Sequence, residues 1–224
     1  MNKVLVAVGA TITLTALYAL MRKRSLGETS PKVSSLFLLG DSQTRGGLGE
    51  AFSAAFSEAG VQVDWFGKDG ATHLHYLERP TLFDKLECAD VIYIQLGDNG
   101  VPGDKSQVHE LIRRIRERCP KVEKIYWGGP MKVVTPTVKS RYVSSDPSSW
   151  RYLPSYNAAR REWDSRLAAW VEEVGVSYIS NYSLQEAQPV DSPFSDSRKG
   201  DGLHLDKASR EALSYLVRDI VLGV

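Results

Sequence analysis

Cysteine is scarce in this chain, which has only Cys88 and Cys119 among its 224 residues. Two cysteines cannot build a disulfide framework, and they are too few for a multi-cysteine zinc module. A single disulfide between the two is the alternative, but Cys88 precedes a predicted buried strand and Cys119 ends a predicted helix. Because cysteine commonly behaves as a small buried hydrophobe, we predict two free thiols.

The chain also lacks a surplus of either charge. Lys+Arg 28 against Asp+Glu 27 gives a formal net charge of +1. A protein that binds nucleic acid by neutralising phosphates would be strongly basic, so we predict no nucleic-acid partner. Hydrophobic residues make up 42% and charged residues 25%, which is ordinary for a globular protein and excludes a disordered one.

One long hydrophobic run is present, because residues 4–21 contain no charged side chain. Lys3 precedes the run, and Arg22, Lys23 and Arg24 follow it. About 20 apolar residues are needed to cross a bilayer core, so this run lies at the short end of spanning length. A cleaved signal peptide is the alternative. No Ala-x-Ala cleavage site precedes the basic cluster, so we favour an uncleaved transmembrane anchor.

The chain is accordingly divided into three parts. Residues 1–24 are predicted as the membrane anchor with its basic flank, residues 25–32 as a polar linker and residues 33–224 as the main domain. Lys and Arg are more numerous after the hydrophobic run than before it. The positive-inside rule therefore places the main domain on the cytoplasmic side, or on the interior side of a viral membrane. An exported domain in a cell envelope is the alternative.

The main domain alternates predicted strands and helices. Short apolar or alternating segments predict strands at 33–39, 61–66, 90–96, 122–127 and 176–179. Apolar residues at helical spacing predict helices at 47–59, 106–118, 156–174 and 205–221. This alternation predicts an α/β fold with a parallel sheet covered by helices on both faces. Ligands of such sheets bind beyond the carboxyl ends of the strands.

Small and polar residues follow three of the predicted strands. Ser42 follows the first strand in the sequence Gly40-Asp41-Ser42, on a turn that would expose its hydroxyl. Gly70 follows the second strand, and a glycine can present a bare N–H to a ligand. Asn99 follows the third, and its side-chain amide can donate to a developing oxyanion. Each residue alone is also typical of an ordinary turn.

An acid and a base lie just before the last predicted helix, at Asp201 and His204. An aspartate can hold one imidazole nitrogen while the other takes a proton from a serine. On their own, these two residues would equally suit a helix N-terminus with a surface histidine.

Taken together, these residues resemble the SGNH hydrolase superfamily of GDSL esterases and lipases. The matching motifs are GDSQT, Gly70, Gly97-x-Asn99 and Asp201-x-x-His204, and the resemblance extends from about Val33 to the end of the chain. It implies a three-layer α/β/α sandwich, SGNH or flavodoxin-like, with a parallel sheet of about five strands. It also implies a serine hydrolase that acts on ester bonds and needs neither a metal nor an organic cofactor.

The resemblance gives each of these residues a role. Ser42 would be the nucleophile, His204 the general base and Asp201 the residue that orients His204. The backbone N–H groups of Ser42 and Gly70, with the side chain of Asn99, would form the oxyanion hole.

The chain departs from the family at the residue after Asn99, which is Gly100 where the family commonly has an aspartate. An acidic residue is therefore missing beside the oxyanion hole, unless Asp98 substitutes for it.

A long segment with little periodicity, residues 131–155, lies before the predicted helix at 156–174. Long loops of this kind often bind substrate. Tyr142, Trp150 and Tyr152 could stack on a sugar ring or line an acyl channel, and His73 could contact substrate near the glycine position.

Because the segment is polar and has no long aliphatic run, we expect a membrane-anchored esterase that removes small acyl (acetyl) groups from carbohydrate. A lipase or lysophospholipase is the alternative, since an anchor would hold the site near lipid. From another class, the chain could be a non-catalytic, membrane-tethered structural or glycan- or partner-binding protein, such as a virion component. The oligomeric state is left open.

Overall fold

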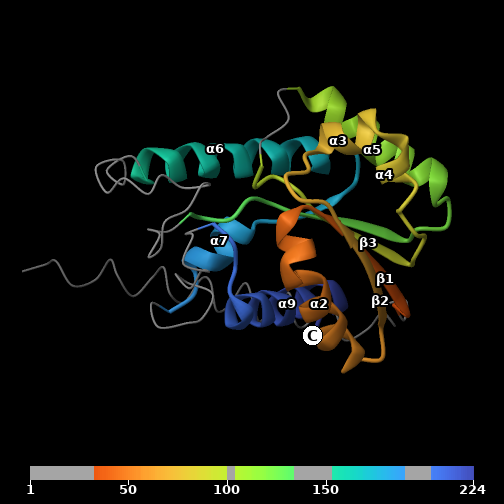
Figure 1. The fold of residues 1–224 in the computed structure, drawn as a ribbon, viewed down its shortest axis with the longest axis horizontal. Helices are drawn as coiled ribbons and strands as arrows, with labels where there is room; N and C mark the ends of the chain where they lie inside the picture. The colour runs from red at the N-terminus through yellow and green to blue at the C-terminus, as the bar shows by residue number, and fades with distance from the viewer. Residues whose placement is uncertain (1–32, 100–103, 134–152, 190–202) are drawn as a thin grey trace, which may run out of the picture. The chain divides into compact units, whose positions relative to one another are not determined.

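The computed structural model describes residues 33–99, 104–133, 153–189 and 203–224. In these residues, five parallel strands form one sheet in the order β2-β1-β3-β4-β5 (Figure 1). The strands are β1 (Ser35–Gly40), β2 (Gln62–Gly67), β3 (Val91–Gln95), β4 (Lys124–Gly128) and β5 (Ser177–Ile179). The predicted α/β fold with a parallel sheet of about five strands is confirmed.

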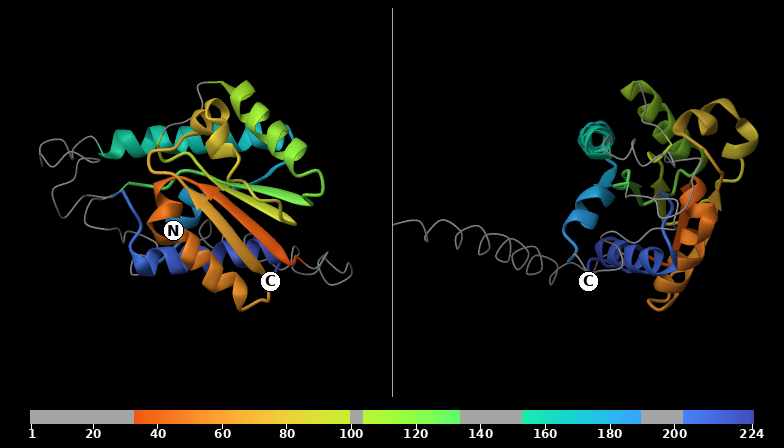
Figure 2. Two further views of the ribbon diagram at one scale, coloured as in Figure 1. Left: turned by 45° about the vertical axis from the view of Figure 1, so that its right-hand side comes forward. Right: turned by 60° about the vertical axis from the view of Figure 1, so that its left-hand side comes forward.

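Helices cover both faces of the sheet, which gives three layers (Figures 1 and 2). One face carries the helices α3 (His73–Glu78), α4 (Pro80–Phe83), α5 (Lys105–Arg118) and α6 (Leu153–Glu172). The other face carries α2 (Gly49–Ser57), which follows the π-helical turn η1 (Thr44–Leu48), together with α7 (Asn181–Glu186) and α9 (Lys207–Leu222).

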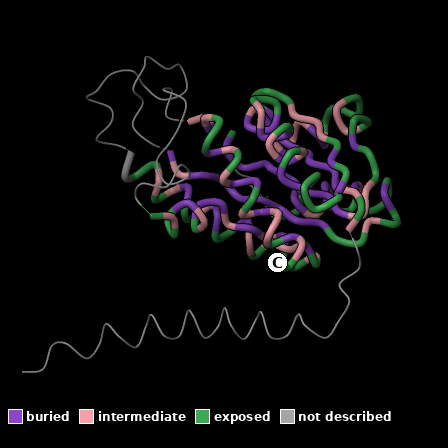
Figure 3. Tube along the Cα trace, turned by 90° about the horizontal axis from the view of Figure 1, so that it is seen from below, coloured by how far each residue is buried: buried purple, intermediate pink, exposed green. Residues whose placement is uncertain are grey.

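The central strands are buried because both of their faces are covered (Figure 3). Every residue of β3 is buried, and this strand consists mainly of the β-branched and aromatic residues that suit a sheet interior. Side chains of a strand alternate between faces. In β1, Leu36 and Leu38 accordingly join the core under α2 and α9, whereas Phe37 and Leu39 join the core under α5 and α6.

The short helices α3, α4 and α7 were not predicted from the sequence. Each has only four to six residues, so the helical spacing of apolar residues cannot be recognised over its length. Local capping starts them instead. Thr72 and His75 form a capping box at α3, Pro80 occupies the first turn of α4, and the Ser180 side chain accepts from the backbone of Ser183 at α7.

The prediction of two free thiols is wrong. Cys88 and Cys119 form a disulfide, with their Cα atoms 5.2 Å apart. Cys119 ends α5, and the last turn of that helix lies against the loop that precedes β3. Arg118 fixes this contact, since its guanidinium donates to the carbonyl oxygens of Leu86 and Asp84. The sequence located both cysteines in the right elements, but it gave no sign that these elements meet.

The predicted membrane anchor, residues 4–21, and the predicted linker, residues 25–32, lie outside the described residues. Within the part of the chain that the structure describes, no helix combines the length and the apolar character that a membrane span requires.

Candidate active site

The candidate site lies at the carboxyl edge of the sheet, where the first three strands end side by side. Gly40, the last residue of β1, pairs with Gly67 of β2 and with Gln95 of β3. Asp41 and Ser42 follow Gly40 directly, and the loops that carry Gly70 and Asn99 leave the ends of β2 and β3. The topology therefore brings the predicted serine, glycine and asparagine positions to one edge.

Glycine is required at two of these strand ends so that the serine loop can approach the sheet. A Cβ at Gly40 would overlap the Thr44 side chain, and a Cβ at Gly67 would press on the backbone of Asp41 and Arg45. The loop is fixed there by its own backbone, since the Arg45 N–H donates to the Asp41 carbonyl over 3.1 Å. Gly67 is thus a packing residue, and Gly70 is the glycine of the loop beyond it.

Ser42 and His204 are brought into hydrogen-bonding contact across 162 positions of sequence. The distance from Ser42 Oγ to His204 Nε2 is 3.0 Å, and both side chains are half-buried. This is the separation at which an imidazole can take the proton of a serine hydroxyl. For Nε2 to accept that proton, the neutral ring must carry its own proton on Nδ1.

Asn99 is tied to the two neighbouring strand ends. Its amide nitrogen donates to Asp41 Oδ2 over 3.0 Å and to the carbonyl oxygen of Ala71 over 3.3 Å. Asp41 precedes Ser42, and Ala71 follows Gly70, which has a left-handed φ of 68° in an exposed turn. The three predicted oxyanion-hole positions therefore belong to one connected cluster.

No family model and no curated protein sequence match the chain. Solved structures do match it. A lipase/acylhydrolase from Enterococcus faecalis is 19% identical, with a TM-score of 0.54 over 85% of this chain and 96% of that one. An extracellular lipase from Streptomyces rimosus is 14% identical, with a TM-score of 0.56 over 82% and 98%. An acetylxylan esterase from Geobacillus stearothermophilus is 13% identical, with a TM-score of 0.56 over 87% and 97%.

The chain has the SGNH hydrolase fold. These likenesses extend over nearly the whole length of each matched protein.

Asp41 is a buried carboxyl group within this SGNH site. Its Oδ1 accepts the Gln43 backbone N–H over 2.9 Å, and its Oδ2 accepts from Asn99. Burial raises the pKa of Asp41 well above its usual range, and the nearby charge of Asp98 raises it further, against the lowering effect of the Gln43 N–H. The aspartate of the GDSQT motif therefore fixes the orientation of the Asn99 amide.

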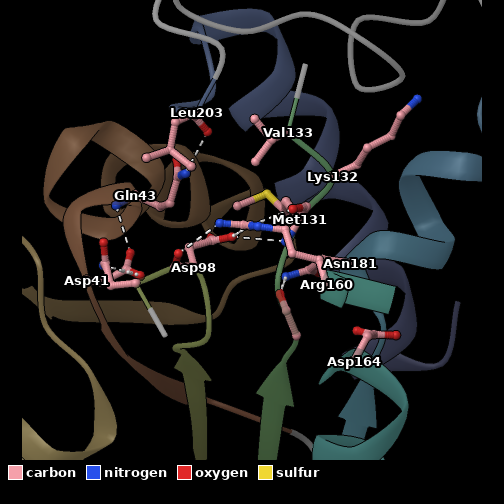
Figure 4. Close-up of polar contacts among 12 residues, drawn as sticks. Asp41, Gln43, Asp98, Met131, Lys132, Val133, Arg160, Asp164, Asn181 and Leu203 are labelled. Carbon is pink, nitrogen blue, oxygen red and sulfur yellow. Dashed lines mark hydrogen bonds and ion pairs between the residues drawn. The ribbon is translucent and has the colours of Figure 1, made fainter. Parts of the chain in front are cut away.

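Asp98 has a different partner. It forms a buried ion pair with Arg160 of α6, in which Arg160 Nη1 lies 2.7 Å from Asp98 Oδ1 (Figure 4). Arg160 also donates to the carbonyl oxygens of Met131 and of Asp98 itself, and Asp98 Oδ1 accepts the Met131 N–H. Asp98 thus anchors the loop after β3 to the loop after β4. The orientation of Asn99 comes from Asp41, not from Asp98.

His73 lies in the contact between α3 and α5 and is 3% exposed. Its Nε2 is 2.9 Å from Gln107 Oε1, and burial lowers its pKa below the usual value. The neighbouring His75 caps its own helix through Nδ1, which accepts the Thr72 N–H. The sequence offered a substrate-binding role for His73. The structure gives its ring a partner inside the helical layer, and that role stays a prediction.

Four of the predicted site residues lie outside the described residues: Asp201, Tyr142, Trp150 and Tyr152. Sequence reasoning missed the supporting residues Asp41 and Arg160. Asp41 belongs to the quoted motif and was passed over as a turn former, whereas Arg160 is one of many arginines and carried no signal. Among the described residues, no group of three or more His, Cys, Asp or Glu side chains is arranged to hold a metal ion.

Proposed function

We propose that the protein is a serine esterase that hydrolyses its substrate through an acyl-enzyme. The observation that carries this proposal is the 3.0 Å contact between Ser42 Oγ and His204 Nε2 at the carboxyl edge of an SGNH-type sheet. A serine hydroxyl is a weak nucleophile until a base removes its proton, and this contact supplies the base.

Each step of the reaction has a residue to perform it. His204 takes the Ser42 proton as the hydroxyl oxygen attacks the ester carbonyl, and then returns it to the leaving alcohol as the acyl-enzyme forms. Water activated by His204 releases the acid and regenerates Ser42. We assign to Asp201 the task of holding the protonated ring at Nδ1, as the resemblance implies.

The oxyanion of the tetrahedral intermediate would be stabilised by the N–H groups of Ser42 and Gly70 and by the Asn99 amide. Both Asn99 amide hydrogens have protein acceptors, Asp41 Oδ2 at 3.0 Å and the Ala71 carbonyl at 3.3 Å. The Ala71 bond is the longer of the two, so it is the one that a negatively charged oxyanion would displace. The Asp41 bond would keep the amide in place meanwhile.

For the substrate, we propose small acyl groups on carbohydrate, with a lipid or lysophospholipid ester as the alternative. The exposed side chains beside the serine loop are polar: Arg45 and Asp69 form an ion pair there. An aromatic ring suited to a sugar face is also near the site. Tyr156 is exposed and lies against the Arg160 guanidinium, which holds the Asp98 backbone next to Asn99.

For location, we propose that residues 4–21 anchor the protein in a membrane and that the domain is exported. Both inferences go beyond the described residues. The Cys88–Cys119 disulfide supports the exported alternative, because disulfides persist in oxidising compartments and are rare in the cytosol. The excess of Lys and Arg after the hydrophobic run favours the opposite side, but that excess amounts to only a few residues.

The test uses the full-length chain in a mild detergent. Release of p-nitrophenol from acetate and octanoate esters is compared with that of the Ser42→Ala variant, and a serine-reactive phosphonate probe is applied to both. Turnover and labelling that disappear in the variant would establish the serine esterase, and the ratio of the two esters would choose between small acyl groups and lipid. A folded protein with neither turnover nor labelling would favour the non-catalytic binding or structural alternative.

A further inference from the structure

The residue after the proposed nucleophile, Gln43, reaches across the site to the segment that carries the proposed base. Its side-chain Nε2 donates to the carbonyl oxygen of Leu203 over 3.0 Å (Figure 4). Its Oε1 accepts the backbone N–H of Leu205 over 3.1 Å. Leu203 and Leu205 are the two neighbours of His204, so one amide group bridges the backbone on both sides of the base.

We propose that Gln43 is a positioning residue that holds His204 at hydrogen-bonding distance from Ser42. The inference rests on the proposed function, since it assigns Gln43 a task in that same reaction. Gln43 as a whole is 3% exposed, and its backbone is itself fixed by the N–H bond to Asp41 Oδ1. The amide therefore extends from a fixed point, and water has little access to compete for its two hydrogen bonds.

The arrangement matches the hydrogen-bonding groups of a glutamine side chain. The segment offers one carbonyl and one N–H, and a neutral primary amide presents the matching donor and acceptor on one planar group. Arg210 of α9 makes a second tie between the same two segments, because its Nη1 donates to the carbonyl oxygens of Gly46 and Leu205. The serine loop and the histidine segment are thus fastened on either side of the reacting pair.

A positioning role has a distinct kinetic signature. Gln43 bonds to backbone groups and not to the imidazole or the serine hydroxyl. Its loss should misplace the base without changing the groups that titrate or those that bind substrate. A misplacement of about 1 Å can cost about 10²-fold in rate. We therefore expect a lower kcat, with the KM and the pH midpoint of kcat/KM unchanged.

The deciding variant is Gln43→Met in the full-length chain, assayed with p-nitrophenyl acetate and with the phosphonate probe. Methionine has a similar volume and forms neither hydrogen bond. The matched control is Gln185→Met, because Gln185 is also buried, at 1% exposed, and its Oε1 accepts a backbone N–H from Lys132. We expect kcat and labelling rate to fall together by about 10- to 100-fold in Gln43→Met and to stay within about twofold of wild type in the control.

Gln43→Glu provides a second measurement, which also decides the matter if Gln43→Met does not fold. A protonated carboxyl group keeps both an acceptor for Leu205 and a donor for Leu203, whereas a carboxylate loses the donor and faces the Leu203 carbonyl. The activity of Gln43→Glu relative to wild type should therefore fall as the pH rises. A constant ratio would contradict the inference.

The proposed function and the positioning role of Gln43 can be refuted separately. Wild-type protein without turnover or labelling would refute the proposed function and, with it, the role of Gln43. Active wild-type protein whose kcat is unchanged in Gln43→Met would refute the inference alone. So would an equal loss of kcat in Gln43→Met and Gln185→Met, because that result would reflect a general effect of removing a buried amide.

Discussion

Replacing Arg160 with methionine should destabilise the domain severely, because it leaves a buried carboxylate without its cation. The side chains of Arg160 and Asp98 are 1% and 2% exposed. Besides the ion pair, Arg160 satisfies two carbonyl oxygens, one on Met131 and one on Asp98. Methionine fills much of the same space, so the substitution isolates the loss of charge and donors from the loss of packing.

The size of this loss in stability can be estimated from the interactions that Arg160 makes. Removing one partner of a buried ion pair typically costs about 3–5 kcal/mol. Each buried carbonyl left without a donor adds about 1–3 kcal/mol. Asp98 Oδ1 keeps the Met131 N–H bond at 3.0 Å, which offsets part of the loss. These losses together come to at least about 5 kcal/mol, so we expect the free energy of unfolding to fall by that amount or more, a large share of the roughly 5–15 kcal/mol that holds a domain together.

Urea denaturation of the full-length chain would measure this loss for Arg160→Met, for Asp98→Asn and for the double variant. Removing both charges leaves no unpaired ion, so the double variant should be more stable than Arg160→Met by at least about 1 kcal/mol. Esterase activity at a temperature where all variants are folded should also fall in Arg160→Met, since Asn99 follows the anchored Asp98. A loss below about 1 kcal/mol in Arg160→Met, or strictly additive single effects, would refute the reasoning.

Three further predictions concern the oxyanion hole, the buried acid and the disulfide. Asn99→Ala should lower kcat by about 10²–10³-fold with little change in KM, and an unchanged kcat would remove Asn99 from the oxyanion hole. The raised pKa of Asp41 means that the folded chain keeps a proton in a pH range where the unfolded chain has lost it. The free energy of unfolding of wild type should therefore decline relative to that of Asp41→Asn as the pH rises above the usual aspartate pKa. Urea denaturation of both proteins from about pH 4 to 8 would measure this decline. A difference in unfolding free energy that stays constant over that range would contradict the prediction. Reducing the Cys88–Cys119 bond, which spans 31 positions, should lower stability by about 3–4 kcal/mol on the chain-entropy model, and a melting temperature unaffected by reductant would contradict that figure.

Much of this fold could be predicted because its signals are local. The strands around Ile92 and Leu38 are short apolar segments, and α5 shows a clear apolar period from Val108 to Ile115. Ser42 and Asn99 could be singled out because each follows the end of a strand, and ligands of parallel sheets bind beyond the carboxyl ends of the strands.

What could not be predicted depends on contacts between distant parts of the chain. The ion pair of Asp98 and Arg160 joins residues 62 positions apart, and neither residue differs locally from the other charged residues of the sequence. The disulfide has the same character, since each cysteine looks like a buried hydrophobe until α5 folds back onto the loop before β3. Short helices such as α3 are specified by caps, which a search for periodicity does not detect.

The proposed reactive groups and the residues that we infer to position them are therefore encoded in different ways. Ser42, Asn99 and His204 belong to short local motifs, each of which can be recognised in the sequence by itself. Their spacing in three dimensions depends on side chains that tie one strand end or segment to the next. Asp41 joins the loop after β1 to that after β3, Arg160 joins the loops after β3 and β4 to α6, and Gln43 joins the serine loop to the segment before α9. All three are buried, so a change in any of them acts on geometry before it acts on chemistry. Measuring both kcat and the free energy of unfolding for variants of these three residues would separate an effect on catalysis from an effect on stability. At a positioning residue, kcat should fall by more than the loss of folded protein can explain.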